Sequence, residues 1–116
     1  VIVLGITFKE NCSDLRNSKV ADLVKDLQGF GCQVHVHDPL AQPNQALHEY
    51  SLMLTDWDQL PQNVDAMVAA VSHKEYISQP IASLLAPLKS GGVFIDIKSA
   101  YLPEAITSTG ARLWRL

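Results

Sequence analysis

VIVLGITFKENCSDLRNS, residues 1–18, is the segment that decides the predicted fold. It begins with an apolar run at residues 1–4, which is typical of a buried strand. Apolar side chains then follow at the i, i+3, i+4 and i+7 spacing of a helix, at Val20, Leu23, Val24 and Leu27. In α/β domains, the loops that join a strand to the next helix gather at the carboxyl edge of a parallel sheet, where ligands bind. Residues 5–18 are therefore predicted to be a ligand-binding loop.

The rest of the chain continues the alternation of strands and helices. Residues 32–37 alternate in polarity, and residues 66–71 and 93–97 are continuous apolar runs, as expected for strands buried on both faces. The other expected elements are helices at 40–51, 80–88 and 103–108, a helical turn at 56–60, at most a short edge strand at 52–54, and a final strand at 112–116. We predict an α/β, Rossmann-like, doubly wound sheet, mainly parallel, with helices on both faces and strand order 3-2-1-4-5-6.

Composition and charge narrow the class of protein. The chain has 116 residues, of which 47% are hydrophobic and 18% charged, as expected for one soluble globular domain. Its net charge is −3 and it has no basic block, so we expect no binding to nucleic acid or to an acidic membrane surface. No apolar run is long enough to span a bilayer, and no signal peptide is recognisable. The chain begins without methionine and directly in a predicted strand, so we expect a fragment of a longer protein.

The cysteines and histidines form no metal or disulfide pattern. Cys12 and Cys32 have neither disulfide nor zinc spacing, which predicts a reducing, cytoplasmic location. Cys12 lies between two cationic residues that could activate a thiol, but no base is close in sequence, so a packing role is favoured. His35 and His37 share a strand face without a third ligand, and we therefore predict no metal site.

Several polar side chains follow strands that should end at the same edge of the sheet. In the predicted order, the topological switch falls between the first strand and the strand at 66–71, and ligands bind at that point. The candidates for one site there are Lys9, Arg16, His73, Lys74, Lys98 and Tyr101. The first loop contains Gly5 but no G-x-G-x-x-G or P-loop pattern. We therefore expect that this chain does not hold NAD, and that Lys9 and loop N–H groups would meet any phosphate.

Other side chains in these loops are expected to support the structure. Asp14 and Arg16 should brace the loop, as an ion pair or through a domain contact, and Ser18 should cap the helix that follows. Asp38 is interpreted as part of a turn, because the glycine fingerprint that accompanies a ribose-binding acid is missing. For His73, contact with a ligand and a hydrogen bond at the strand end both stay open.

Two motifs resemble a known family. The pattern Gly5-x-x-Phe8-Lys9-x-Asn11-x-x-Asp14-x-Arg16-x-Ser18, followed by Val34-x-Val36-x-Asp38-Pro39, resembles the carboxyl-terminal, nucleotide-binding domain of UDP-glucose/GDP-mannose 6-dehydrogenases. The segments FKENC at 8–12 and LWR at 113–115 are most similar to bacterial members that oxidise UDP-N-acetylhexosamines for surface polysaccharides. The resemblance covers essentially the whole chain.

The resemblance implies a function for the whole enzyme. Family members use NAD to oxidise the C6 alcohol of a UDP-sugar to a carboxylate, through a thiohemiacetal and a thioester on a cysteine. It implies that an amino-terminal domain binds NAD, that the catalytic cysteine belongs to the earlier domains, and that a central helical domain forms a homodimer or higher oligomer. Residues 1–116 would then be a single UDP-binding domain that contains no catalytic residue and is inactive alone.

The resemblance also implies roles for single residues. Lys9 would pair with the UDP diphosphate, and Phe8 would present its backbone and ring near the nucleotide. Many members have an arginine after the strand at 93–97, where this chain has Lys98, which supplies a point charge instead of a planar fork. Together, Phe8, Lys9, His73 and Lys98 are the residues that we expect to bind UDP.

The alternative from another class is a non-catalytic, flavodoxin-like nucleotide-binding or signalling module. A receiver domain needs an acidic pair at the end of its first strand, whereas this strand ends at Leu4-Gly5. The hexose or N-acetylhexosamine that is used, the preference for uridine over guanosine, and the number of subunits stay open.

Overall fold

A five-stranded sheet forms the centre of the computed structural model, which describes residues 1–115. The strand order is β2-β1-β3-β4-β5, and every neighbouring pair is parallel. The strands are β1 (Ile2–Leu4), β2 (His35–His37), β3 (Val64–Ala69), β4 (Leu88–Asp96) and β5 (Arg112–Arg115). The predicted α/β, Rossmann-like fold is confirmed.

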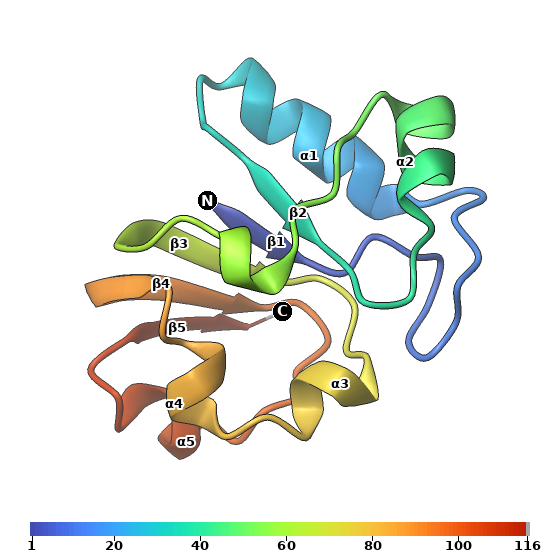
Figure 1. The fold of residues 1–116 in the computed structure, drawn as a ribbon. Helices are drawn as coiled ribbons and strands as arrows, with labels where there is room; N and C mark the ends of the chain where they lie inside the picture. Colours follow the sequence, from blue (N-terminus) through green and yellow to red (C-terminus); the bar gives the residue numbers. More distant parts are fainter. Residues whose placement is uncertain (116) are drawn as a thin grey trace.

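Helices cover both faces of the sheet (Figure 1). One face carries α1 (Lys19–Gly29) and α2 (Pro43–Tyr50). The other carries the 3₁₀ turn η1 (Trp57–Gln59) and the short helices α3 (Lys74–Ile77), α4 (Ile81–Leu84) and α5 (Pro103–Thr107). The chain changes face between β2 and β3, so the topological switch lies between the neighbouring strands β1 and β3.

The observed elements differ from the prediction mainly in length. The predicted strand at 52–54 is reduced to one bridge, between Val36 and Leu54, at the outer side of β2. The helix predicted at 80–88 ends at Leu84, where residues 85–87 form a turn that includes Pro87 and leads into β4 at Leu88. Helix α3 is absent from the prediction, since its four residues are too few to show a helical period. Residue 116, which belongs to the predicted last strand, lies outside the described residues.

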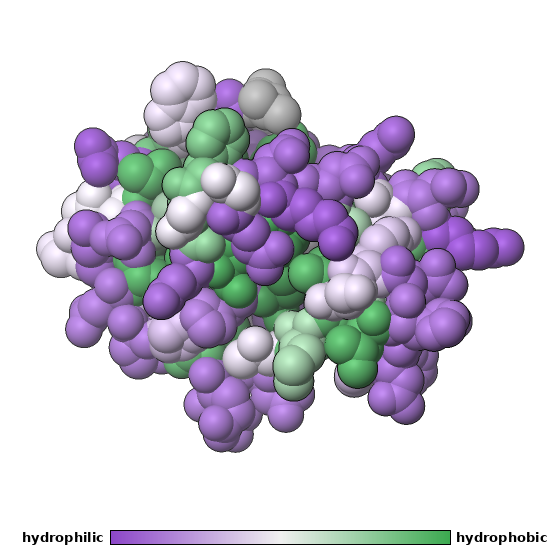
Figure 2. Space-filling view, turned by 90° about the horizontal axis from the view of Figure 1, so that it is seen from above, coloured by the Kyte–Doolittle hydropathy of each residue, from purple (hydrophilic) through white to green (hydrophobic). Residues whose placement is uncertain are grey.

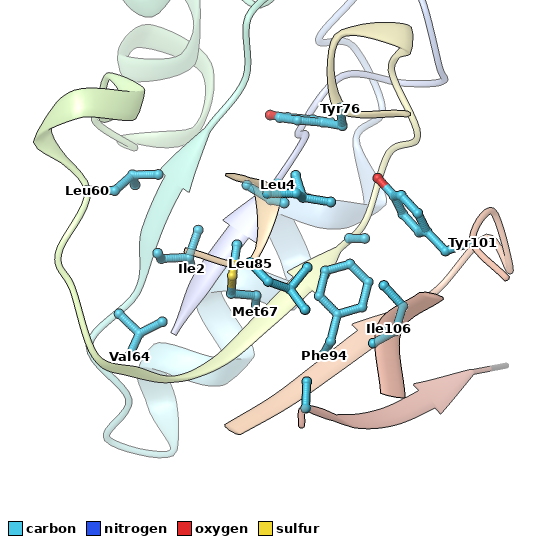
Figure 3. Packing of buried hydrophobic residues seen from close by; sticks show 13 residues of the cluster. Ile2, Leu4, Leu60, Val64, Met67, Tyr76, Leu85, Phe94, Tyr101 and Ile106 are labelled. Atoms are coloured by element: carbon cyan, nitrogen blue, oxygen red, sulfur yellow. The ribbon is translucent and has the colours of Figure 1, made fainter. Parts of the chain in front are cut away.

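An apolar core lies on each side of the sheet, because successive strand residues point to opposite faces. Val3, Val36 and Val68 face α1 and pack with Ala21 and Val24 of that helix. Figure 3 shows the second core, where strand residues meet side chains of the short helices; it includes Ile2, Leu4, Met67, Phe94, Tyr76 and Ile106. A large apolar side chain contributes about 1.5–3 kcal/mol when it is fully buried, so these strands give a rigid base to the loops at their carboxyl ends.

The face that carries α1 and α2 is less completely covered near β4 and β5. Figure 2 looks down on this side and shows an apolar area set deeper among polar side chains. Ile95 and Ile97 are only half-buried although they pack against the α1 core, and Trp114, which pairs with Ile95, is 67% exposed. Apolar sheet surface therefore stays accessible beside α1.

The chain leaves β1 through Gly5, whose φ is +92°. A Cβ atom on this residue would lie only 2.5 Å from the Cβ of Val71. Glycine adopts this backbone conformation without strain and leaves room for the chain that follows β3. The close approach brings the loop after β1 beside the loop after β3.

Candidate functional site

A cleft of about 460 Å³ opens at the carboxyl edge of the sheet. It lies between the start of α1 and the chain segments that follow β1, β3 and β4. Its lining residues are Thr7, Phe8, Asn17, Lys19, Val20, Leu23, Ala70, Val71, Ile97 and Lys98. Ligands of open α/β sheets bind at the carboxyl edge beside the topological switch, so this cleft is the candidate site.

The cleft combines an apolar wall with cationic groups. Leu23, Val71 and Ile97 supply apolar surface, while Lys19 and Lys98 each supply an ammonium group. Helix α1 begins here, and the N–H groups and positive dipole end of a helix start favour an anion. An apolar wall beside cationic groups suits a ligand that joins a flat ring to a phosphate.

The residues predicted to bind a ligand occupy three different positions. Phe8, which is 57% exposed, and Lys98 line the cleft. Lys9 follows Phe8 on the exposed part of the loop but is not among the lining residues. His73 is 0% exposed. The structure therefore brings Phe8 and Lys98 together, holds Lys9 one residue away along the chain, and keeps His73 inside the protein.

Three further candidates at this edge lie apart from the cleft. Arg16 lines a neighbouring cavity of about 540 Å³, which also contacts Glu49 and Tyr50 of α2. Lys74 is exposed at the start of α3. Tyr101 is buried, and burial together with a nearby carboxylate raises its pKa to about 12. Of the six candidates from the sequence, all of which lie within the described residues, Lys98 alone lines the cleft.

The loop after β1 closes on itself through Asp14. The Phe8 N–H donates to the Asp14 carbonyl over 2.7 Å. The Arg16 guanidinium donates to both carboxylate oxygens of Asp14, over 3.1 Å and 3.0 Å. These side-chain hydrogen bonds, and one from the Arg16 N–H, hold the pKa of Asp14 below its ordinary value. Asp14 and Arg16 thus form an ion pair within the loop.

Ser18 joins the end of the loop to α1. Its Oγ accepts the Ala21 N–H over 3.3 Å, which makes Ser18 the N-cap, and donates to the Ile6 carbonyl over 2.6 Å. The Tyr50 hydroxyl, at the end of α2, donates to the Leu15 carbonyl and accepts the Ser18 N–H over 3.1 Å. The end of the loop is therefore fixed to both helices of this face.

A buried histidine and aspartate hold the loop from the side of β2 and β3. His73 Nε2 lies 3.0 Å from Asp38 Oδ2 and 3.2 Å from Thr7 Oγ1. His73 Nδ1 accepts the Asn11 N–H over 2.9 Å. Both side chains of the pair are 0% exposed. The sequence left two roles open for His73, contact with a ligand and a hydrogen bond at the strand end. The structure shows hydrogen bonds at the strand end.

Asp38 has a larger role than its sequence context predicts. Its Oδ2 also accepts the N–H groups of Ile6 and Thr7, over 2.7 Å and 3.3 Å, and its Oδ1 accepts those of Leu40 and Ala41, over 2.8 Å and 3.0 Å. Burial alone would raise the pKa of Asp38, but the hydrogen bonds from the histidine and the backbone outweigh burial and hold the pKa below its ordinary value. Asp38 therefore joins the ends of β1, β2 and β3 as well as forming the expected turn.

The same contacts decide whether this edge fits NAD. An acid at the end of β2 can hold a ribose only if its carboxylate is exposed to the ligand, whereas the Asp38 side chain is 0% exposed and both of its oxygens accept protein donors. A G-x-G-x-x-G fingerprint that begins at Gly5 would also need glycines at the positions of Thr7 and Glu10, the first of which lets the backbone approach a pyrophosphate. This edge of the sheet therefore has neither the free acid nor the glycines of a dinucleotide site.

Asp96 holds the loop after β4 in a similar way. It is 0% exposed, and its two carboxylate oxygens accept the N–H groups of Ala100 and Tyr101, each over 3.0 Å. These bonds fold back the segment that carries the exposed Lys98. Asp96 was not among the predicted site residues. A lone acid at the end of an apolar strand is the signal that could have found it, because a buried carboxylate needs internal donors.

Residues 1–115 contain no group of three or more His, Cys, Asp or Glu side chains that could hold a metal ion. Both cysteines, Cys12 and Cys32, are free thiols. Within the same residues, no helix is long and apolar enough to cross a membrane.

Comparison with known sequences gives consistent matches. The model of the UDP-glucose/GDP-mannose dehydrogenase family, UDP binding domain, matches residues 2–103. Protein CapL of Staphylococcus aureus is 39% identical over 116 residues, which are 100% of this chain and 27% of CapL. The UDP-N-acetyl-D-glucosamine 6-dehydrogenase of Pseudomonas aeruginosa is 36% identical over 100 residues, which are 84% of this chain and 23% of that enzyme.

Comparison with solved structures gives the same fold. The crystal structure of NDP-N-acetyl-D-galactosaminuronic acid dehydrogenase from Methanosarcina mazei Go1 matches with a TM-score of 0.83 at 21% identity, covering 98% of this chain and 24% of that one. This chain spans about a quarter of the length of these relatives. Because the family model matches most of the sequence, the chain belongs to the UDP-glucose/GDP-mannose dehydrogenase family, as a UDP binding domain.

Proposed function

We propose that residues 1–116 are the UDP-binding domain of an NAD-dependent UDP-sugar 6-dehydrogenase, and that the cleft at the carboxyl edge of the sheet holds the UDP part of the substrate. The observation that carries this proposal is the cleft itself, which has an apolar wall and lysines beside it. UDP joins a flat ring to a diphosphate, so its two parts match these two kinds of surface.

Three exposed residues have separate roles in this proposal. Phe8 offers its ring to the flat uracil, since aromatic rings gain from stacking as well as from burial. Lys98 pairs with the diphosphate from the β4 side of the cleft, and Lys9 reaches it from the first loop. His73 contacts no nucleotide, because its ring is buried and both of its nitrogens are hydrogen-bonded within the protein.

We assign the oxidation to parts of the enzyme outside this chain. The relatives are about four times as long as the chain, which leaves room for domains that hold NAD, the catalytic cysteine and the contacts of an oligomer. One relative is named as a UDP-N-acetyl-D-glucosamine 6-dehydrogenase, and we propose that this protein too oxidises the C6 alcohol of a UDP-N-acetylhexosamine to a carboxylate, in the cytoplasm.

Calorimetric titration of UDP into four forms of the chain tests the proposed site. These are the unchanged protein, Lys98→Ala, Lys9→Ala and the control Lys25→Ala, which removes a charge from the exposed side of α1. A charge-assisted hydrogen bond contributes about 1.5–3 kcal/mol, so loss of either site lysine should weaken UDP binding by about tenfold or more. Lys25→Ala should bind as the unchanged protein does. Equal affinities in all four forms, or no binding by the unchanged protein, would remove the nucleotide from this cleft.

A flavodoxin-like signalling module is the alternative that these findings disfavour, because the family match and the relatives are dehydrogenases. Phosphorylation of the chain by a small-molecule phosphodonor would revive it.

A further inference from the structure

We propose that His73 is a positioning residue that fixes the loop between β1 and α1 for UDP, and that it does so as the neutral ring with its proton on Nε2. This inference rests on the proposed function only for its binding test. The geometry of the loop carries it independently.

The direction of the hydrogen bonds defines the tautomer. A backbone N–H can only donate, so the Asn11 N–H requires a lone pair on His73 Nδ1. The proton of the neutral ring must then lie on Nε2, which is 3.0 Å from Asp38 Oδ2. The ionised carboxylate can only accept, so it selects the same tautomer from the other side of the ring.

Thr7 extends the same chain of hydrogen bonds to a second point of the loop. Its hydroxyl donates to the Lys9 carbonyl over 3.0 Å, which leaves an Oγ1 lone pair for His73 Nε2 at 3.2 Å. The bonds therefore run in one direction from Asn11 through the ring to Asp38 and Thr7. They fix the backbone on both sides of Glu10.

Asn11 is one of two non-glycine residues of the loop with a left-handed backbone conformation, the other being Asn17. Its φ is +58°, a left-handed conformation that costs free energy in any residue with a Cβ, although asparagine tolerates it better than most. Its side-chain oxygen accepts the Lys74 N–H over 2.8 Å, so the residue is tied at both its amide and its side chain to the segment that follows β3. Loss of the bond to His73 would leave this strained residue with weaker support.

The consequence is a preorganised nucleotide loop. The side chains of Phe8 and Lys9 are exposed, while the Lys9 carbonyl is held by the buried Thr7 hydroxyl and the Phe8 N–H by the Asp14 carbonyl of the same loop. A ligand then meets a loop that is already ordered, and less free energy is lost in ordering it on binding. His73 should thus affect UDP affinity without touching UDP.

Two substitutions of His73 test the hydrogen bonds of the two ring nitrogens separately. In His73→Asn the amide oxygen can lie near the position of Nδ1 and accept the Asn11 N–H, but the bond to Asp38 is lost. In His73→Gln the amide N–H₂ can lie near the position of Nε2 and donate to Asp38, but the Asn11 N–H loses its acceptor. We expect His73→Gln to weaken UDP binding by about tenfold, and His73→Asn by no more than about threefold, although both lose stability. The control is His48→Gln, an exposed position on α2.

NMR supplies a readout that needs no ligand. In the unchanged chain at neutral pH, we expect a nitrogen shift of an unprotonated acceptor at Nδ1, a protonated Nε2, and slow hydrogen exchange at the Asn11 amide. Exchange at Asn11 should stay slow in His73→Asn and become fast in His73→Gln. A proton on Nδ1, or equal exchange in the two variants, would overturn the inference.

If the unchanged chain shows the expected shifts and exchange but binds no UDP, the proposed function fails and the role of His73 in ordering the loop stands. If UDP binds and the two variants have equal affinity, the positioning role fails and the nucleotide site stands.

Discussion

Two loops carry a lysine to the carboxyl edge of the sheet, and they are held by different means. The loop with Lys98 is held by Asp96, which accepts the N–H groups of residues only four and five positions further along the chain. The loop with Lys9 is held through Asp38 and His73, which come from the ends of β2 and β3. One loop is therefore a local turn, and the other requires that three strands have already assembled.

The difference shows how this domain can present cations over a rigid base. In both loops a fully buried side chain orders the backbone, while the lysine side chain remains exposed. The first loop is longer and is held by more partners: Ser18 Oγ joins its end to the Ile6 carbonyl at its start, and Asp38 and His73 bind the backbone between. Its geometry should therefore be the more sensitive of the two to changes far away in the sequence.

The largest effect that the comparison predicts is that of Asp38→Ala. The substitution removes the acceptor of His73 Nε2 and leaves the buried N–H groups of Ile6 and Thr7 without an acceptor. A buried donor without an acceptor costs about 1–3 kcal/mol, so we expect a loss of about 3–5 kcal/mol in the free energy of unfolding, measured by urea denaturation. The control Asp65→Ala removes an exposed ion pair with Lys89 and should leave the urea midpoint nearly unchanged. Equal effects of the two substitutions would show that Asp38 does not join the strands energetically.

A smaller effect is expected for Asp96→Ala. Two buried or half-buried N–H groups lose their acceptor, but the partners lie within one turn and can reach water by a local movement. The free energy of unfolding should fall by about 1–3 kcal/mol in the same denaturation experiment. Amide exchange should rise at Ala100 and Tyr101 and stay unchanged at Asn11. Faster exchange at Asn11 as well would mean that the two loops are not independent.

The dependence of stability on pH sharpens the comparison further. The pKa of Asp38 is lower in the folded chain than its ordinary value of 3.8, so the unfolded chain binds a proton more readily. The stabilisation that the ionised Asp38 carboxylate gives to the folded chain is complete above pH 3.8, its ordinary pKa. This stabilisation is lost as the pH falls from that value towards the lower pKa of the folded chain. Urea denaturation between pH 5 and pH 2, in steps of about half a unit, should show this loss in the unchanged chain and a shallower loss in Asp38→Asn. Parallel pH profiles in the two forms would contradict the assignment.

The smallest effect is expected for Asp14→Asn. The Asp14–Arg16 ion pair lies at the surface of the first loop, where solvent screens the charges. In Asp14→Asn, the amide exchange rates of the loop should depend less on salt concentration than in the unchanged chain. The urea midpoint should stay within error of that of the unchanged chain. A clear shift of the midpoint would show that the loop is stabilised from its surface more than through His73.

Much of the fold could be predicted because it depends on local patterns. The apolar runs at 1–4, 66–71 and 93–97 and the helical spacing after Ser18 are visible in sequence, and the rules of parallel sheets supply their order. The short helix α3 and the reduced strand at 52–54 could not be predicted in this way, since each has too few residues to show a period.

The position of the candidate site could be predicted from the sequence, but the contacts of its residues could not. Sequence placed Phe8 and Lys98 at the carboxyl edge of the sheet, where both line the cleft, because both follow strands that end there. It could not show the partners of Asp38, since the histidine that meets it is 35 positions further along the chain, and no local pattern encodes that contact. Nor could it show that Lys9, although exposed, lies outside the lining of the cleft. The path of the loop depends on all the hydrogen bonds that hold it, and most of these come from distant parts of the sequence.

The most direct test of the nucleotide cleft is an NMR titration of the ¹⁵N-labelled chain with UDP. Binding at the carboxyl edge should shift the amide signals of Thr7, Phe8, Lys19, Val71 and Lys98, which surround the cleft. The signals of Gln33, Asn63 and Asp65, which line a cavity at the opposite edge, should not move. Shifts confined to that opposite edge, or no shifts at saturating UDP, would contradict the account.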